Sequence, residues 1–166
     1  MIALPFPNAY WVQQDRWLAG EYPGGPTRDE TRARLTALGA LGSDTFVDLT
    51  QPGELPAYAA ELARGTLHVR KPIPDHGLPL EPWHMSEIIA VIDDLLGEGR
   101  RLYLHCRAGI GRTGTVVGCH LAQHGQRGDA ALDALNVLWA GSARSRSWPS
   151  IPETDELRDF VYRWPA

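Results

Sequence analysis

Five residues separate Cys106 from Arg112, and two of them, Gly109 and Gly111, are glycines. A loop this short can curl so that its backbone N–H groups converge on a tetrahedral oxyanion, because glycine accepts backbone angles and close approaches that other residues resist. The same positive field favours a thiolate over a thiol. Arg112 can present a planar fork to two oxygens of the anion, which lysine cannot do. The spacing therefore predicts a nucleophilic cysteine inside an anion-binding loop.

The segments on either side of this loop are those that would position it. Residues 101–104 (Arg-Leu-Tyr-Leu) are typical of a buried strand, and residues 113–123 have the composition of a helix. A helix that begins directly after Arg112 would direct the positive end of its dipole at the bound anion. We expect a strand, loop and helix unit that carries the chemistry.

The rest of the chain alternates between strand and helix patterns. Strands are expected at 11–19, 45–49 and 66–69, and helices at 27–39 (with a Thr27–Glu30 capping box), 55–63, 82–96, 129–138 and 153–162 (with a Ser150–Glu153 capping box). This alternation predicts an α/β fold in which helices flank a central, mainly parallel sheet of about four to five strands. No repeat or linker divides the sequence, so residues 1–166 are expected to form a single domain.

The segment His105-Cys106-x5-Arg112-Thr113 resembles the signature loop of the protein tyrosine and dual-specificity phosphatases, which implies a protein-tyrosine-phosphatase-like (dual-specificity phosphatase) fold. The stretches Ala19–Gly24 and Ser150–Thr154 are also similar to small, dual-specificity-like bacterial members of that superfamily. The resemblance implies a phosphocysteine intermediate on Cys106 and a Thr113 hydroxyl that assists. It also implies that His105 orients the loop and tunes the thiolate. The residues expected to bind phosphate through backbone amides or the guanidinium are Arg107, Ala108, Gly109, Ile110, Gly111 and Arg112.

The same family supplies its general acid from an aspartate on a mobile loop about thirty residues before the cysteine. Asp75 fits this position, because it lies 31 residues before Cys106 in the segment Pro72–Pro79. Prolines on both sides and Gly77 within suggest a loop that moves between defined positions. One carboxyl group at Asp75 could protonate the leaving group and later activate water.

Composition narrows the possible partners and the cellular location of the chain. The net charge of −4 argues against a general nucleic-acid partner, which would meet a basic surface. No apolar run approaches the length of a membrane span, and residues 1–10 lack the pattern of a signal peptide. Two cysteines are too few for a secreted disulfide framework, so a reducing, cytoplasmic location is expected. All but one of the 16 basic residues are arginine, which is a hint of bacterial origin.

No metal or other cofactor is expected. The histidines His76, His84, His120 and His124 show no ligand-like arrangement with carboxylates or thiols in the sequence. Cys119 falls within the helix after the loop and is expected in the core. Glu153 is interpreted as a helix-capping residue.

The leading substrate class is a phosphorylated protein, with phosphotyrosine first and phosphoserine or phosphothreonine next. A phosphoinositide or inositol phosphate phosphatase of the same fold is an alternative, although the loop lacks the lysines typical of lipid phosphatases. A catalytically silent phosphopeptide-binding module is a second alternative, disfavoured by the joint presence of Cys106, Arg112 and Asp75. Sulfur transfer and arsenate reduction are further alternatives, because both use anion loops that begin with a cysteine. They are disfavoured, since arsenate reductases carry such a loop near the N-terminus and sulfurtransferase loops do not usually close on an Arg-Thr pair. The oligomeric state stays open.

Overall fold

The computed structural model describes residues 3–79 and 81–165, so the expected domain 1–166 includes four residues, 1, 2, 80 and 166, that lie outside the described part. The described strands are β1 (Tyr10–Gln13), β2 (Trp17–Gly20), β3 (Thr45–Asp48), β4 (Leu67–Arg70) and β5 (Leu102–His105). The α-helices are α1 (Arg28–Ala40), α2 (Pro82–Gly97), α3 (Arg112–Gln123), α4 (Asp129–Trp139) and α5 (Asp155–Arg163). Two short 3-10 helices, η1 (Ala59–Glu61) and η2 (Ala143–Arg146), complete the set.

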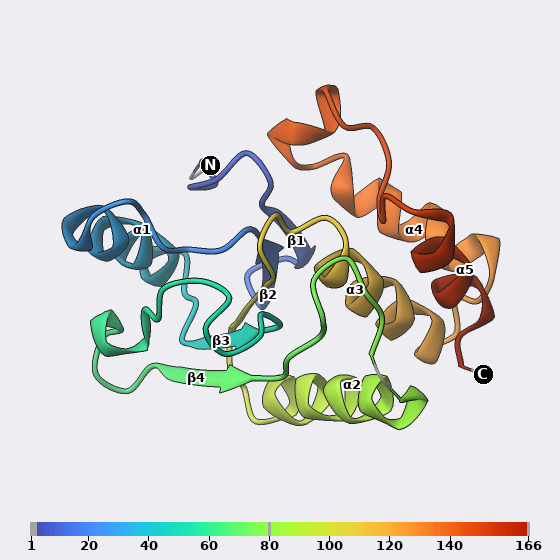
Figure 1. Ribbon diagram of the computed structural model, residues 1–166, viewed down its shortest axis with the longest axis horizontal. Helices are drawn as coiled ribbons and strands as arrows, with labels where there is room; N and C mark the ends of the chain where they lie inside the picture. Colours follow the sequence, from blue (N-terminus) through green and yellow to red (C-terminus); the bar gives the residue numbers. More distant parts are fainter. Residues whose placement is uncertain (1–2, 80, 166) are drawn as a thin grey trace.

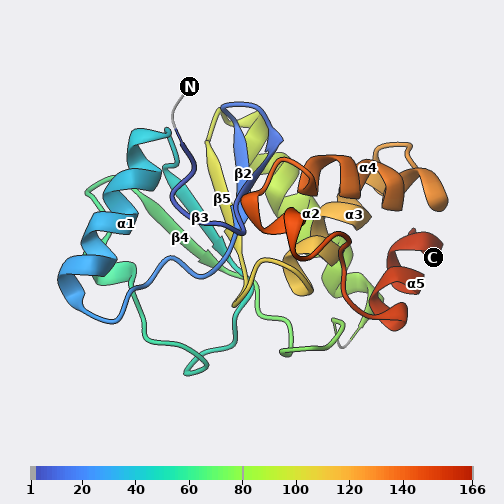
Figure 2. The same cartoon turned by 90° about the horizontal axis from the view of Figure 1, so that it is seen from above.

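The strands form one five-stranded sheet in the order β1-β2-β5-β3-β4. β1 pairs with β2 in antiparallel fashion, and the three other pairings are parallel. Figure 2 shows α1 on one face of this sheet and α2, α3, α4 and α5 on the other. The predicted α/β architecture with a mainly parallel sheet is confirmed.

Alternation along the strands divides the core into two layers, because successive side chains of a strand point to opposite faces. Leu18, Phe46 and Tyr103 pack in a cluster that includes residues of α1. Their neighbours Val47 and Leu104 belong to the larger cluster with α2 and α3. Each central strand therefore holds helices against both faces, as parallel sheets require.

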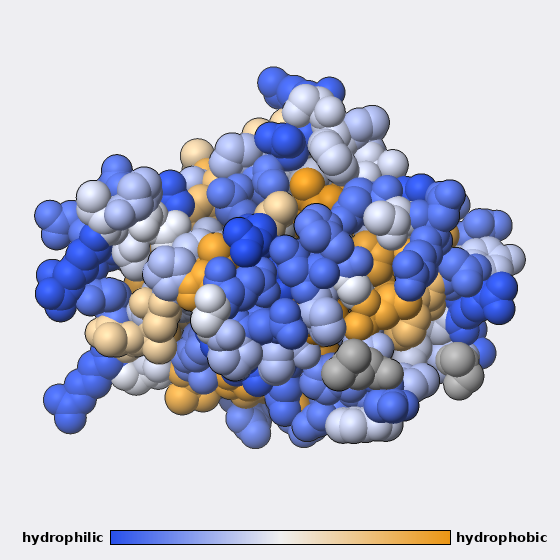
Figure 3. Space-filling view, viewed as in Figure 1, coloured by the Kyte–Doolittle hydropathy of each residue, from blue (hydrophilic) through white to orange (hydrophobic). Residues whose placement is uncertain are grey.

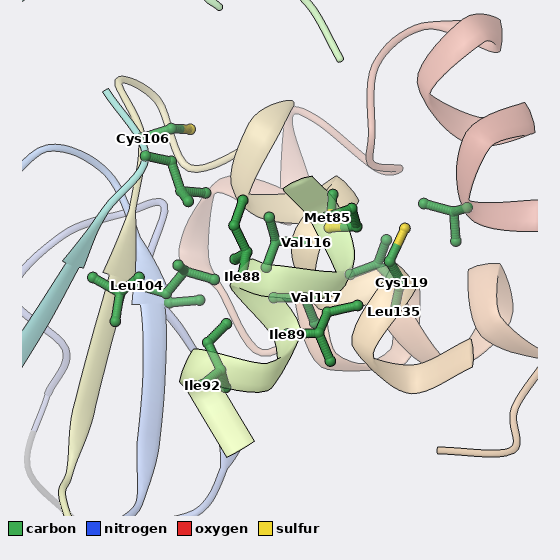
Figure 4. Close-up of a cluster of buried hydrophobic side chains, with 14 of the residues drawn as sticks. Met85, Ile88, Ile89, Ile92, Leu104, Cys106, Val116, Val117, Cys119 and Leu135 are labelled. Carbon is green, nitrogen blue, oxygen red and sulfur yellow. The ribbon is translucent and has the colours of Figure 1, made fainter. Parts of the chain in front are cut away.

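The helix α2 packs along α3 through an apolar seam. Met85, Ile88, Ile89 and Ile92 of α2 follow helical spacing and are all buried. Figure 4 shows these side chains facing Val116 and Val117 of α3, with Leu104 of the sheet beside them. Both helices are thereby fixed against the strand that leads into the cysteine loop.

The two predicted capping boxes have different outcomes. The Thr27–Glu30 box at α1 is confirmed, with each side chain bonded to the other residue's backbone. The Ser150–Glu153 box is wrong, because α5 begins two residues later than expected, and Thr154 caps it by accepting from the N–H of Leu157. The Glu153 side chain therefore does not cap α5 and can make other contacts.

Two strand and helix predictions also need correction. The single strand expected at 11–19 is a hairpin of β1 and β2, turned by Asp15, whose φ of 60° is left-handed. Asp tolerates that conformation better than most residues do. The helix expected at 55–63 is reduced to the three-residue η1.

The carboxyl ends of β2, β3 and β5 meet at one edge of the sheet, since Gly20 and Asp48 both pair with His105. The loops that follow β3, β4 and β5 gather at this edge (Figures 1 and 2). The centre of the face drawn in Figure 3 is mainly hydrophilic, and apolar residues show in separate patches. In parallel sheets this edge is where ligands bind. Among the described residues, no helix is long and apolar enough to cross a bilayer.

The seam yields a stability prediction. Ile88→Ala should lower the free energy of unfolding by about 2–5 kcal/mol, because Ile88 is fully buried and the truncation leaves a cavity. Val137→Ala is the control, since Val137 is 74% exposed and should change stability by less than about 0.5 kcal/mol. Urea unfolding measures the free energy of unfolding of both variants. Similar losses in Ile88→Ala and Val137→Ala would show that the seam is not a main source of stability.

Candidate active site

The loop of residues 106–111 joins β5 to α3 and wraps around the thiol of Cys106, which is 3% exposed. The backbone N–H of Gly109 donates to Sγ of Cys106 at 3.3 Å. Gly109 has a φ of 77°, and a Cβ added there would lie 2.5 Å from the backbone carbon of Gly20. This position therefore requires glycine for both its conformation and its close approach to β2.

Neighbouring segments hold the loop from outside. The Asn8 side chain donates to the carbonyl of Ala108 at 2.7 Å, and the N–H of Tyr22 donates to the carbonyl of Arg107 at 3.0 Å. Both bonds use carbonyl groups, so the loop's carbonyls point outward to protein partners. Such an arrangement leaves backbone N–H groups for the inside of the loop.

His105 is completely buried and does not hydrogen-bond to the thiol of Cys106. Its Nδ1 donates to the carbonyl of Cys106 at 3.0 Å, because a carbonyl can only accept. Burial lowers the pKa of His105, so the ring is neutral at neutral pH and its Nε2 accepts from the hydroxyl of Tyr58 at 2.6 Å. Burial also raises the pKa of Tyr58, which keeps that hydroxyl protonated. The chain from Tyr58 through His105 orients the backbone at the start of the loop.

Arg112 begins α3 and is only 2% exposed. Its two terminal nitrogens donate to the two oxygens of Glu54 at 2.8 and 2.7 Å. The carbonyl of Ile73 accepts a further bond at 3.0 Å, and Asp75 accepts one at 2.9 Å. The guanidinium is thus held in one plane beside the cysteine loop.

Glu54 lies in the loop after β3, and its side chain is 8% exposed. The hydrogen bonds from Arg112 lower the pKa of Glu54 from 4.5 to about 2. Glu54 is therefore charged at neutral pH and compensates the buried guanidinium. No sequence signal pointed to this residue, because its partner is 58 positions away.

Asp75 is brought to the cysteine loop as expected. Besides Arg112, its carboxylate lies 3.4 Å from Nε of Arg107, and it accepts the N–H of His76 at 3.0 Å. His76 has a φ of 58°, which turns the chain sharply just after Asp75. The Asp75 side chain is one-third exposed and lines the same pocket as Arg112.

Thr113 is buried, but its hydroxyl has no hydrogen-bond partner among the described residues. The structure places it directly behind the loop without joining it to the sulfur. A buried hydroxyl that lacks a partner costs about 1–3 kcal/mol. A partner supplied by a bound state of the loop would recover that cost.

A pocket of about 250 Å³ opens over the loop. Cys106, Arg112 and Asp75 line it, together with Trp148 and Glu153 from the segment before α5. Glu153 is therefore not a capping residue. A Cβ on Gly111 would lie 2.8 Å from Oε1 of Glu153, at the end of a flexible side chain, so Glu153 reaches the loop closely at this position.

The other residues singled out in the sequence, Cys119 and the histidines, lie outside the cysteine loop. Cys119 is fully buried in the core, and Figure 4 shows it well apart from Cys106, as expected for a structural thiol. Burial raises the pKa of the Cys119 thiol, so it stays protonated. The expectation that the histidines lack carboxylate partners in a ligand-like arrangement is wrong for His120 and His124, which both contact Asp93. These three residues could hold a metal ion and lie outside the pocket over the loop.

Four residues of the site were not predicted from the sequence: Glu54, Tyr58, Trp148 and, as a pocket residue, Glu153. Each lies in a loop or a 3-10 turn with no local pattern, and the contacts of Glu54, Tyr58 and Glu153 each span more than 40 positions. Only the Gln51-Pro52-Gly53-Glu54 turn directly after a buried strand could have suggested a functional loop, since such loops carry function at the carboxyl edge of a sheet.

Comparison with known proteins identifies the family of this chain. Residues 24–126, more than half of the chain, match the family described as "Polymorphic toxin system, DSP-PTPase phosphatase". The chain is 32% identical over 165 residues to the protein named "Putative tyrosine phosphatase 067L" of Invertebrate iridescent virus 3. That alignment covers 87% of this chain and 61% of the viral protein, so the chain spans about three fifths of the relative's length.

Two solved structures show the same fold. Tk-PTP in its active form superposes with a TM-score of 0.72 at 24% identity, over 94% of this chain and 95% of that one. The kinase associated phosphatase, with serine in place of its catalytic cysteine, gives a TM-score of 0.75 at 19% identity, over 95% and 92% of the two chains. The family match includes Asp75, Cys106 and Arg112. The chain belongs to the DSP-PTPase phosphatase family and has the fold of the small dual-specificity-like cysteine phosphatases.

Proposed function

We propose that this chain hydrolyses phosphomonoesters of proteins in two steps through a phosphocysteine on Cys106. The observation that carries the proposal is the pocket that Cys106, Arg112 and Asp75 line together. A nucleophile, an anion-binding fork and a proton donor within one pocket are the parts that the reaction needs.

In the first step the phosphate binds to the loop amides of residues 107–111 and to Arg112. The guanidinium exchanges its bond with Asp75 for bonds with phosphate oxygens, while Glu54 keeps the fork aligned. Sγ of Cys106 attacks phosphorus, so an S–P bond forms as the P–O bond to the leaving group breaks. Asp75, in its protonated form, gives its proton to the leaving oxygen.

In the second step a water molecule enters on the side that the leaving group vacated. The Asp75 carboxylate takes a proton from this water. The oxygen of the water then attacks phosphorus, and the S–P bond breaks. Inorganic phosphate and the thiolate are the products. Neither step consumes a cofactor.

Phosphotyrosine is the proposed leading substrate, with phosphoserine and phosphothreonine also accepted. Trp148 supports this choice, because its indole lines the pocket beside the cysteine and can pack against a phenyl ring. Arg144 lies 5.9 Å from the centre of the same indole and adds positive charge near the pocket wall. We place the enzyme in a reducing, cytoplasmic compartment, because both cysteines are free thiols.

Cys106→Ser should lower phosphate release on the order of 10⁴-fold or more, the scale on which loss of a nucleophile acts. Cys119→Ala is the matched control and should retain activity, because its thiol is buried in the core. Release of inorganic phosphate from a phosphotyrosyl peptide and from an inositol phosphate measures both points. Turnover that persists in Cys106→Ser would refute the mechanism, and faster release from the inositol phosphate would refute the substrate class.

Asp75→Asn should lower kcat about 10²–10⁴-fold for a phosphoseryl peptide, whose alkoxide leaving group needs a proton. With para-nitrophenyl phosphate the first step should lose much less, since its leaving group departs without protonation. Asp129→Asn changes an exposed aspartate and serves as the control. An equal loss in the rate of the first step, measured as the burst of leaving group with each substrate, would exclude Asp75 as the proton donor.

Glu54→Gln should lower kcat/KM about tenfold to 100-fold, because the fork of Arg112 loses its charged, bidentate support. Glu61→Gln is the control, since Glu61 pairs with Arg28 and Arg32 away from the loop. Unchanged kcat/KM in Glu54→Gln would show that Arg112 needs no such partner.

The effect of Glu54→Gln on the free energy of unfolding should depend on pH. The pKa of Glu54 is lower in the folded chain, so its contribution to stability is full above about pH 4.5 and is lost as the pH falls toward 2. The difference in free energy of unfolding between the parent and Glu54→Gln should shrink across this range. Urea unfolding at several pH values measures it, and a constant difference would contradict the pairing.

A further inference from the structure

A second cluster of functional side chains lies at the other end of α3. Asp93 stands near the C-terminus of α2, His120 in the last turn of α3, and His124 directly after it. α2 ends just before β5 and α3 begins just after it, and the C-terminal parts of the two helices meet at this cluster. His120 lies about 12 Å along α3 from Arg112, at 1.5 Å per residue. The cluster is therefore remote from the cysteine.

The three side chains converge on one point. Nε2 of His120 lies 2.7 Å from Oδ1 of Asp93, and Nε2 of His124 lies 3.0 Å from Oδ2. One nitrogen or oxygen from each residue falls within 4.8 Å of the others. In a tetrahedral zinc site with bonds of about 2.0–2.1 Å, neighbouring ligand atoms are about 3.3 Å apart. Shifts of side chains alone would bring these atoms to that spacing.

The helical spacing makes the arrangement rigid. Residues four apart on a helix lie on one face, and the two imidazole rings are 4.3 Å apart between centres. The side chain of His120 is 8% exposed and packs edge-on against the buried Trp17 at 4.8 Å. Asp93 and His124 are 37% and 53% exposed, so an ion can enter from solvent.

The surroundings suit a cation. A cleft of about 380 Å³ opens at the cluster, and Gln13 and Gln126 line it with additional oxygen atoms. The C-terminal ends of α2 and α3 both point their negative dipole ends toward this region. One positive side chain, Arg16, also lines the cleft, but its guanidinium donates to the carbonyl of Leu96 at 3.0 Å.

We propose that Asp93, His120 and His124 bind a divalent transition-metal ion of the zinc type, with water or a glutamine oxygen completing the coordination. Two imidazoles and one carboxylate form a donor set that zinc accepts and that magnesium does not favour. Each imidazole binds through Nε2 and keeps its proton on Nδ1. The ion ties the end of α2 to the end of α3 and takes no part in phosphoryl transfer.

The competing interpretation is a plain hydrogen-bonded latch, in which each imidazole donates one N–H to Asp93. The latch and the metal site use the same three residues, so loss of stability on mutation does not distinguish them. Saturable binding of the metal does.

The experiment titrates Zn²⁺ into untagged, full-length protein by calorimetry, in the Cys106→Ser background so that the active-site thiol cannot bind the metal. We expect one Zn²⁺ per chain and a higher Tm in its presence, with no such response to Mg²⁺. Asp93→Asn and His124→Gln keep the size of their side chains and should weaken binding by about tenfold to 100-fold or more.

His84→Gln is the matched control, since His84 bonds to the carbonyl of Pro72 and lies outside the cluster. It should bind Zn²⁺ as the parent does. Equal affinity in the parent, Asp93→Asn and His124→Gln would overturn the proposal, as would the lack of saturable binding in the parent. Phosphatase activity of His124→Gln in the Cys106 chain should equal that of the parent, so this test is separate from that of the proposed function.

Discussion

The site depends on the burial of one positive charge. Arg112 is 2% exposed, and an unpaired charge at such a position would cost several kcal/mol. Its compensation comes from Glu54 after β3 and Asp75 after β4, with the carbonyl of Ile73 in support. Three loops are thus held together by one guanidinium. Because the sheet places the ends of β3, β4 and β5 at one edge, a single side chain can reach all of them.

The same interaction links the free protein to catalysis. In the mechanism that we propose, a phosphate takes over the bond that Asp75 accepts from Arg112, so substrate binding releases the Asp75 carboxylate. Glu54 binds the fork at both terminal nitrogens and can stay in place. Glu153 adds a third carboxylate at the pocket wall. Because carboxylates repel a bound phosphate, the loop amides and Arg112 must supply most of its stabilisation. That stabilisation depends on the geometry of the loop.

Local patterns in the sequence predicted the parts of the fold and site that depend on neighbours along the chain. The cysteine loop, the helix α2 and the Thr27 cap follow from the spacing of a few adjacent residues. The partners Glu54 and Tyr58, and the convergence of Asp93 on two histidines, depend on contacts between distant segments. The hairpin turn at Asp15 was missed because its left-handed residue is neither glycine nor asparagine. The helix α5 was placed early because two residues with capping chemistry, Ser150 and Thr154, compete for its start.

We propose that Cys106 carries the phosphoryl group between the two steps. The most direct measurement is rapid acid quenching of the protein during turnover of para-nitrophenyl phosphate, followed by mass spectrometry of its peptides. Asp75→Asn should accumulate the intermediate, because the second step loses its base. We expect one added phosphoryl group on the peptide that contains Cys106. A phosphoryl group on another residue, or turnover with no phosphorylated peptide, would contradict it.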